Sequence, residues 1–217
     1  MCGRFTLTSE IKDLQSHFRA TGMAAYPASY NVSPSSEIPV VREGQSGREI
    51  VLCRWGLVPH WAKPDNPYKA INARAETLAK KPFFRDAYRK RRCLIPVNGF
   101  YEWKKLDHTK QPYYFHLPDE ELMGFAGLWD YWEGPDNRFE SCAIITTSAN
   151  EIMKPVHERM PVILARQDYD AWLKDGGESL LVPYPHDMEC RPVRTFVNNP
   201  RNDGKDLIEP LGDRSTG

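Results

Sequence analysis

The spacing of hydrophobic residues predicts two amphipathic helices in the first half of the chain. Apolar residues recur at the helical interval over residues 11–18, where Thr8 or Ser9 can cap a helix that ends before the next glycine. A second helix is predicted over residues 82–90. Its apolar residues form one stripe, and its basic residues, Arg85 among them, lie outside that stripe.

Short runs of aromatic and β-branched residues separated by turn residues predict antiparallel strands. Residues 22–37 are typical of a loop, and residues 38–42 and 49–55 of a hairpin. We expect a short helix after Ser148 and another over residues 168–174, where two glycines stop it. The other predicted strands are 93–96, 100–104, 113–117, 124–129, 141–147, 161–164 and 193–197.

This order of elements indicates an α+β fold with a mostly antiparallel sheet and peripheral helices. The sequence has no internal repeat and no low-complexity segment. We therefore expect a single domain over residues 1–217, in which residues 211–217 form a flexible tail.

Composition narrows the class of protein. Hydrophobic residues make up 41% of the 217 residues, which is enough for a substantial core. The five cysteines are widely spaced, and no CxxC pair or other metal-ligand spacing occurs, so we expect reduced thiols and neither metal nor cofactor. No apolar run approaches the roughly 20 residues needed to cross a bilayer, and no signal peptide is expected. These features predict a cytoplasmic protein without a membrane partner.

Charge is balanced over the whole chain but not along it. There are 29 basic and 29 acidic residues, yet residues 1–110 hold 19 Lys and Arg against 10 Asp and Glu. A basic first half suits phosphate binding. Alternatively, the basic and acidic halves pair with each other in the fold.

Cys2 is a candidate aldehyde trap. Once Met1 is removed, its α-amine and thiol can add to one aldehyde carbon, first as a Schiff base and then as a five-membered thiazolidine. At pH 7 roughly a tenth of an α-amine is neutral, against about four in ten thousand lysine amines. The position of Cys2 alone does not distinguish an aldehyde trap from a small residue that simply follows the initiator methionine.

Four polar stretches lie among hydrophobic residues. If residues 71–77 are extended, Asn72, Arg74 and Glu76 point to one face that could hold a phosphate or sugar; alternatively this face is simply solvated. Glu102 stands between aromatic residues in a predicted core strand. Burial there would make it a proton donor and acceptor near neutral pH, unless it pairs with Lys104 or an arginine.

The other two stretches contain a histidine and two tryptophans. His157 precedes a predicted strand and could shuttle protons, or it could be an ordinary surface histidine. Trp55 and Trp61, interleaved with basic residues, suit base stacking, but tryptophans beside Pro and Gly are also common core anchors.

Taken in order, these stretches resemble the SOS-response-associated peptidase (SRAP) family over nearly the full chain. No single stretch is specific, but the ordered set is. The matching segments are 2–5, 30–34, 55–59 with Trp61, 71–77, 100–104, 156–161, 197–203 and 207–210.

The resemblance implies that the α+β fold has a twisted, barrel-like sheet core. It also implies a monomeric protein that binds single-stranded DNA near replication forks and captures abasic sites as a thiazolidine. By matching position, Cys2 would be the nucleophile, Asn72 would orient the intermediate, Glu102 would hold the α-amine, and His157 would be the acid and base. Arg4 and Arg74 would hold the flanking phosphates. The other expected DNA contacts are Asn31, Trp55, Trp61 and Arg85.

Two other functions stay open from the sequence. The protein could be a non-covalent reader of damaged or modified DNA in which Cys2 is unused. It could also be a cysteine hydrolase of peptides, with Cys2 as nucleophile and His157 as base. The peptidase label of the family refers to release of whatever precedes the cysteine, here Met1.

Overall fold

The computed structural model describes residues 2–64, 68–118 and 122–211. Its α-helices are α1 (Ile11–Phe18), α2 (Ala75–Leu78) and α3 (Pro82–Lys90). The 3-10 helices are η1 (Arg166–Asp168), η3 (Glu178–Leu180), η4 (Thr195–Asn198) and η5 (Lys205–Ile208), and η2 (Ala171–Asp175) is a π-helix. The strands are β1 (Phe5–Leu7), β2 (Ala20–Thr21), β3 (Ser29–Val32), β4 (Glu37–Gly44), β5 (Gly47–Trp55), β6 (Asn72–Arg74), β7 (Arg92–Val97), β8 (Gly99–Lys105), β9 (Lys110–His116), β10 (Met123–Glu133), β11 (Arg138–Ser148), β12 (Arg159–Pro161), β13 (Ile163–Leu164) and β14 (Glu189–Pro192).

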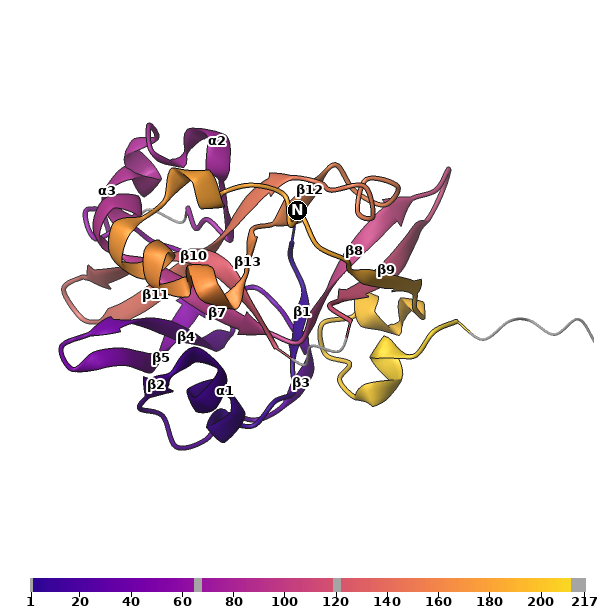
Figure 1. Ribbon diagram of the computed structural model, residues 1–217, viewed down its shortest axis with the longest axis horizontal. Coiled ribbons are helices and arrows are strands. Elements are labelled where there is room, and N and C mark those ends of the chain that lie inside the picture. Colours follow the sequence, from indigo (N-terminus) through magenta and orange to yellow (C-terminus); the bar gives the residue numbers. More distant parts are fainter. Residues whose placement is uncertain (1, 65–67, 119–121, 212–217) are drawn as a thin grey trace, which may run out of the picture.

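Five of these strands close into a barrel. The sheet order β11-β10-β7-β4-β5 returns to its start because β11 also pairs with β5, in parallel, at Cys142 and Trp55. All the other pairs around this ring are antiparallel. The fold is therefore α+β with a largely antiparallel barrel, as the sequence predicted, and the helices lie at its periphery (Figure 1).

A second sheet, in the order β14-β9-β8-β1-β3, extends from the barrel. Within this sheet β1 lies between β8 and β3 and pairs antiparallel with both, so that Phe5 lies opposite Phe100 and Val32. Phe5 also contacts Trp55 of the barrel, with ring centroids 5.1 Å apart. Because β1 is held on three sides, the N-terminal end of the chain is fixed at the junction of the two sheets.

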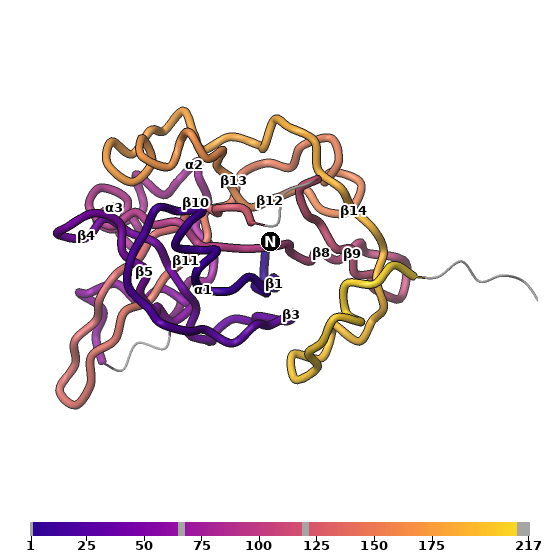
Figure 2. The backbone as a smooth tube through the Cα atoms, turned by 60° about the horizontal axis from the view of Figure 1, so that its bottom comes forward, coloured from indigo at the N-terminus to yellow at the C-terminus, as the bar shows by residue number. Residues whose placement is uncertain are grey.

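The last described segment, residues 193–211, closes over the second sheet. In Figures 1 and 2 this segment lies beside β3 and β9. Val193 and Val197 are buried with Tyr101 and Tyr114 of that sheet. Of the expected tail, residues 212–217 lie outside the described residues, and the N–H of Leu211 donates to the oxygen of Pro192 (3.0 Å).

Most predicted elements are confirmed, including α3 over the expected residues and the hairpin of β4 and β5. The predicted N-cap of α1 is wrong. Glu10, not Thr8 or Ser9, occupies the N-cap position, and among the described residues its side chain makes no capping hydrogen bond. The N–H groups of Thr8 and Ser9 instead donate to the side-chain oxygen of Asn98.

Three other predictions need correction. The expected loop over residues 22–37 contains β3, which β1 recruits as a partner although its sequence is weakly apolar. The segment after Ser148 forms successive turns rather than a helix. The last strand is β14, earlier than the expected 193–197, because the segment beyond it turns into η4.

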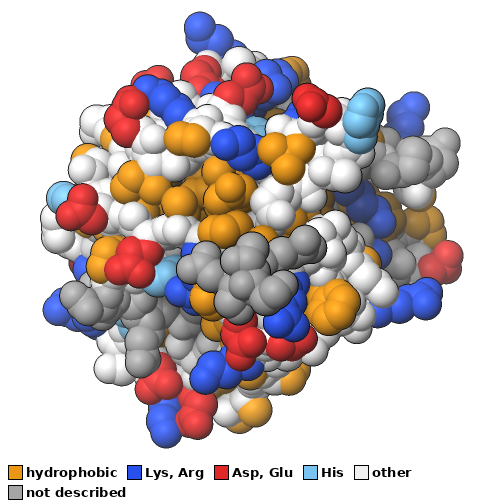
Figure 3. All heavy atoms as spheres, turned by 90° about the vertical axis from the view of Figure 1, so that its right-hand side faces the viewer, with side chains coloured by type: hydrophobic (Ala, Val, Ile, Leu, Met, Phe, Trp, Pro, Cys, Tyr) orange, Lys and Arg blue, Asp and Glu red, His pale blue; other side chains and the backbone are white. Residues whose placement is uncertain are grey.

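The distribution of charge in the fold favours pairing between the two halves of the chain. Arg42 pairs with Glu140 (2.9 Å), and Arg48 pairs with Asp170 (3.1 Å). Arg91 pairs with the buried Asp130 (3.0 Å). Figure 3 accordingly shows acidic and basic side chains mixed around one face, with hydrophobic side chains gathered near its centre. The basic excess of residues 1–110 therefore does not become one uniform basic surface on this face.

Candidate active site

Cys2 is fully buried and lies three residues before the start of strand β1 at Phe5. The side-chain Nδ2 of Asn72, the first residue of β6, donates a hydrogen bond to the main-chain oxygen of Cys2 (2.9 Å). Further along, the N–H of Tyr101 donates to the oxygen of Arg4 (3.0 Å). These bonds fix the main chain on both sides of Gly3, so the position of Cys2 is set by β6 and β8.

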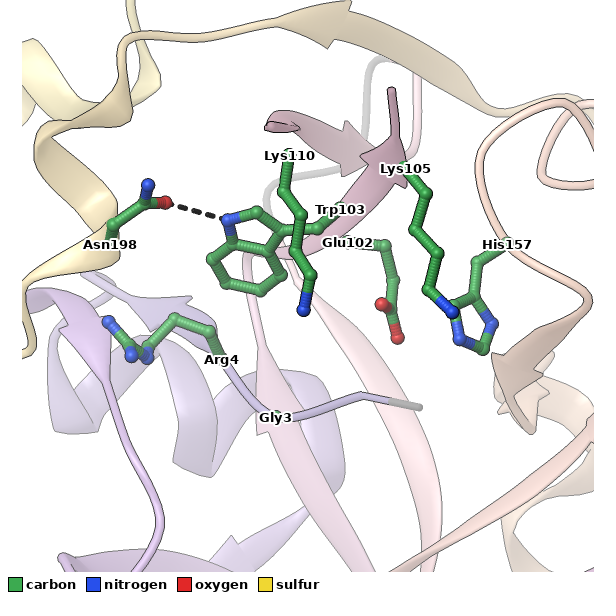
Figure 4. A pocket seen from close by; sticks show the side chains of 8 residues that line it. All are labelled: Gly3, Arg4, Glu102, Trp103, Lys105, Lys110, His157 and Asn198. Atoms are coloured by element: carbon green, nitrogen blue, oxygen red, sulfur yellow. Dashed lines mark hydrogen bonds between the residues drawn. The ribbon is translucent and has the colours of Figure 1, made fainter. Parts of the chain in front are cut away.

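A cavity of about 390 Å³ opens beside this segment (Figure 4). We call it the cleft. Strand β8 contributes Glu102, Trp103 and Lys105, while β9 contributes Lys110. The other residues that line it are Gly3, Arg4, His157 and Asn198. In Figure 4 the carboxylate of Glu102 lies between the side chains of Lys110 and His157.

The cleft combines proton-transfer groups with an excess of positive charge. Arg4, Lys105 and Lys110 surround a single carboxylate, that of Glu102, which is 3% exposed. Burial raises the pKa of the Cys2 thiol above its ordinary value, and the nearby Glu102 carboxylate raises this pKa further. The resting site therefore holds a neutral thiol, and its cations favour an anionic ligand.

Asn31 supports Arg4. Its Oδ1 accepts a hydrogen bond from Arg4 Nη1 (2.6 Å), and its Nδ2 donates to the oxygens of Asn199 (3.0 Å) and Asn202 (2.6 Å). Arg4 Nη1 also donates to the oxygen of Val197 (2.8 Å). Asn31 is 5% exposed with its amide engaged on both sides, and its direct contact with DNA stays a prediction.

His157 lies between a series of turns and strand β12. Its Nδ1 accepts a hydrogen bond from the main-chain N–H of Arg159 (2.9 Å). The guanidinium of Arg159 pairs with Glu76 of α2 through two contacts of 2.5 and 3.0 Å. Glu76 is therefore helical and bound to an arginine, which corrects the expectation that it shares an extended face with Asn72 and Arg74.

The two tryptophans expected to stack on bases lie in different environments. Trp55 is fully buried, and its Nε1 donates to the oxygen of Ile71 (3.0 Å), so it is a core residue and not a stacking surface. Trp61 is 49% exposed and contacts Phe83 edge to face. Its part in DNA binding stays a prediction.

The structure brings together some of the predicted arginines but not all. Arg4 lines the cleft, whereas Arg74 is exposed at the end of β6, where it precedes α2. Arg85 is exposed on α3, which packs against β7, β10 and α2, and its guanidinium lies 3.6 Å from Asp86. Arg85 is not among the residues that line the cleft.

Besides Gly3, sequence reasoning missed four residues that line the cleft, namely Trp103, Lys105, Lys110 and Asn198. Trp103 and Lys105 adjoin Glu102 in the sequence and could have been included with it. Lys110 could be found only through the hairpin register, which places it opposite Lys105. The Trp103 Nε1 donates to Asn198 Oδ1 (2.7 Å), a contact between residues far apart in the sequence.

Two further searches of the described residues concern metals and membranes. Within residues 2–64, 68–118 and 122–211, no three His, Cys, Asp or Glu side chains are grouped so that they could hold a metal ion. In the same part of the chain, no helix has the length and apolar character needed to cross a membrane.

The buried Cys2 thus lies near the carboxylate of Glu102, at a cationic cleft that His157 also lines. The family model described as SOS response associated peptidase (SRAP) matches residues 1–200. The chain belongs to this family.

Similar proteins carry related descriptions. The abasic site processing protein YoqW of Bacillus subtilis is 45% identical, over 96% of this chain and 99% of its own length. The abasic site processing protein HMCES of Xenopus tropicalis is 30% identical, over 86% of this chain and 67% of its own. A crystal structure from Bacteroides thetaiotaomicron has a TM-score of 0.86 and 24% identity, over 97% of this chain and 100% of its own, which shows the shared fold.

Proposed function

We propose that this protein captures abasic sites in single-stranded DNA by a covalent thiazolidine link between Cys2 and the open deoxyribose. The observation that carries the proposal is the position of Cys2, which is held by Asn72 at the edge of a cationic cleft that contains Glu102 and His157. The similarity to proteins named for abasic-site processing supports the same function.

The chemistry begins with opening of the sugar. The hydroxyl at C1′ loses a proton, the bond from C1′ to the ring oxygen breaks, and that oxygen gains a proton, which leaves an aldehyde. The Cys2 α-amine, free once Met1 is removed, adds to this aldehyde and water leaves, giving a Schiff base. The thiol then adds to the same carbon while its proton passes to nitrogen, and the thiazolidine ring is complete.

The protonation state of the thiol favours this order of steps. Because burial and Glu102 raise the pKa of Cys2, little thiolate is available to attack first. The amine would therefore form the first bond, with Glu102 as the acceptor of its proton. The alternative function as a cysteine hydrolase would need a base, such as His157, to take the proton of this thiol.

The remaining residues would position the DNA and the intermediate. Asn72 has an amide oxygen that is buried and accepts no hydrogen bond from the described residues, so it could accept one from the carbinolamine. His157 would protonate the ring oxygen as the sugar opens. Arg4 and Arg74 would bind the phosphates on either side of the lesion, a charge-assisted contact with a counterion-release component.

The test uses the purified chain and a single-stranded oligonucleotide with one abasic site. After denaturing electrophoresis, the wild type should give a heat-stable shifted band, and Cys2→Ala should give none. A form that keeps Met1, confirmed by intact mass, is the matched control because it has the same side chains without the free Cys2 amine.

The outcomes separate the competing functions. A band that persists in Cys2→Ala would refute the mechanism. Binding without any band in the wild type would favour a non-covalent reader of DNA. Hydrolysis of unrelated peptides by the wild type but not by Cys2→Ala would favour a peptidase.

A further inference from the structure

The Nδ1 of the His157 imidazole contacts the main chain of Arg159 at two atoms. The N–H of Arg159 lies 2.9 Å from Nδ1, and its carbonyl oxygen lies 3.1 Å from the same atom. A backbone N–H can only donate, so it stabilises a neutral ring whose Nδ1 is unprotonated and whose proton is on Nε2. A backbone carbonyl can only accept, so it stabilises a ring that carries a proton on Nδ1. The Arg159 main chain can therefore stabilise both the neutral and the protonated imidazole.

Arg159 is itself anchored in three directions. Its position in β12 pairs with Ser148 of β11, and its Nη2 donates to the oxygen of Thr146 (2.6 Å). The third anchor is the two-contact pair with Glu76 on α2. The hydrogen bond from Arg159 lowers the pKa of Glu76, so this carboxylate is ionised at neutral pH.

Other charged and titratable groups also face the imidazole. Glu102 and Lys105 from β8, Lys110 from β9 and Arg4 before β1 line the same cleft, and the Cys2 thiol adjoins it. Along its own chain, Glu158 and Arg159 follow His157 directly. Glu76 does not line the cleft, and its link to the imidazole passes through Arg159.

We propose that Glu76 and Arg159 are positioning residues for His157. By fixing the main chain of Arg159, they hold the imidazole by Nδ1 in either protonation state, so that the orientation of the ring does not change when it gains or loses a proton. The proton given to the ring oxygen leaves from Nε2, and a proton on Nδ1 stays bonded to the Arg159 carbonyl. This inference rests on the proposed function, since it assigns His157 a proton-transfer task.

The first test measures the rate of crosslinking at saturating DNA. Glu76→Gln removes the charge of the pair but keeps its size, and should slow crosslinking about tenfold, a part of what general acid-base catalysis contributes. The same change in a His157→Ala background should have no further effect. Equal slowing in both backgrounds would overturn the proposal, because Glu76 would then act independently of the imidazole.

A matched control is Glu49→Gln, which breaks a comparable arginine pair with Arg42 (2.7 Å) on the β4–β5 hairpin. It should leave the crosslinking rate unchanged, and a loss equal to that of Glu76→Gln would also contradict the proposal.

The second test does not depend on crosslinking. Nitrogen NMR signals of His157 in the DNA-free protein report which nitrogen carries the proton. The neutral wild-type ring should be protonated on Nε2, and Glu76→Gln should give a mixture of the two tautomers. A wild-type proton on Nδ1, or an unchanged tautomer in Glu76→Gln, would overturn the proposal. If the wild type forms no crosslink, the proposed function fails, while the NMR result still decides the positioning of His157.

Discussion

The side-chain amide of Asn72 lies 2.9 Å from the main-chain oxygen of Cys2. The two residues are 70 positions apart, and their contact joins the start of the chain to a short strand that pairs in parallel with β11 of the barrel. The segment at Cys2 is thereby held by a strand that is hydrogen-bonded to the barrel. In most proteins the first residues are poorly ordered unless they are tied down in this way.

Asn72→Ala should reduce the crosslinking rate far more than it reduces stability. One lost hydrogen bond costs about 1 kcal/mol of stability, whereas a small displacement of reacting groups can cost about a hundredfold in rate. Single-turnover gels and thermal melts would measure the two effects. A rate loss no larger than the loss of DNA binding would contradict a role for Asn72 in orienting Cys2.

Asn31→Ala should weaken binding to any single-stranded sequence because it releases the guanidinium of Arg4. If one phosphate contact is lost, the slope of log affinity against log salt should fall by about 0.7. The change also leaves the oxygens of Asn199 and Asn202 without this donor, so stability should fall by about 1 to 3 kcal/mol.

The matched control for Asn31→Ala is Asn98→Ala. Asn98 also bonds to the main chain of a loop, at Thr8 and Ser9, but not to Arg4. It should cost stability without changing the salt slope. Equal salt slopes for the wild type and Asn31→Ala would show that Arg4 binds phosphate without its hydrogen bond to Asn31.

The two tryptophans should respond oppositely to truncation. Trp55→Ala opens a cavity at the junction of the two sheets and should destabilise the fold by about 3 to 5 kcal/mol. Trp61→Ala should leave the unfolding free energy nearly unchanged and weaken single-stranded DNA binding by about 1 to 3 kcal/mol if its ring stacks on a base. Chemical denaturation and fluorescence anisotropy would separate the two, and unaltered affinity in Trp61→Ala would remove Trp61 from the DNA interface.

Glu102→Gln should make the Cys2 thiol more reactive toward iodoacetamide. Its carboxylate raises the pKa of that thiol, so removing the charge lowers the pKa and increases the thiolate fraction at a given pH. Mass spectrometry of the labelled sites at pH 8 would follow this, with the exposed Cys190 as an internal reference in the same molecule. Slower labelling of Cys2 in Glu102→Gln would contradict the assigned direction.

The protein should lose stability as the pH rises above about 8.5. Burial raises the pKa of Cys53 to about 12 and raises the pKa values of Cys93 and Cys142. Above the ordinary thiol pKa, the unfolded chain releases protons that the folded chain keeps, so unfolding is favoured by up to about 1.4 kcal/mol per pH unit for each thiol. Urea titrations at pH 8 and pH 10 would measure the loss, and Cys93→Ala should show a smaller one. An equal loss in Cys93→Ala would attribute the effect to other groups.

Local patterns predicted the elements whose stability is mostly local. Helix α3 and the β4–β5 hairpin follow directly from hydrophobic spacing and turn residues. Strand β3 could not be predicted in that way, because it is defined by pairing with β1. The closing pair of β11 with β5 likewise joins segments too distant for any local pattern.

Some residues of the candidate site could likewise be predicted from local sequence, and others could not. Cys2, Glu102 and His157 were identified from their sequence context, and the fold places them at or in one cleft. Trp55 was ambiguous because core and stacking tryptophans have similar neighbours in the sequence. The support given by Asn31 to Arg4 depends on two carbonyl groups near the end of the chain, which only the tertiary structure brings to it.

The hydrogen bonds that hold Arg4 through Asn31 join parts of the chain that are synthesised at different times. Cys2 is synthesised well before the carbonyl groups of Asn199 and Asn202, which hold Asn31 and through it Arg4. In a nascent chain the Cys2 thiol is therefore present before the cleft can be complete. Specific capture of a lesion should begin only after translation has passed Asn199 and Asn202.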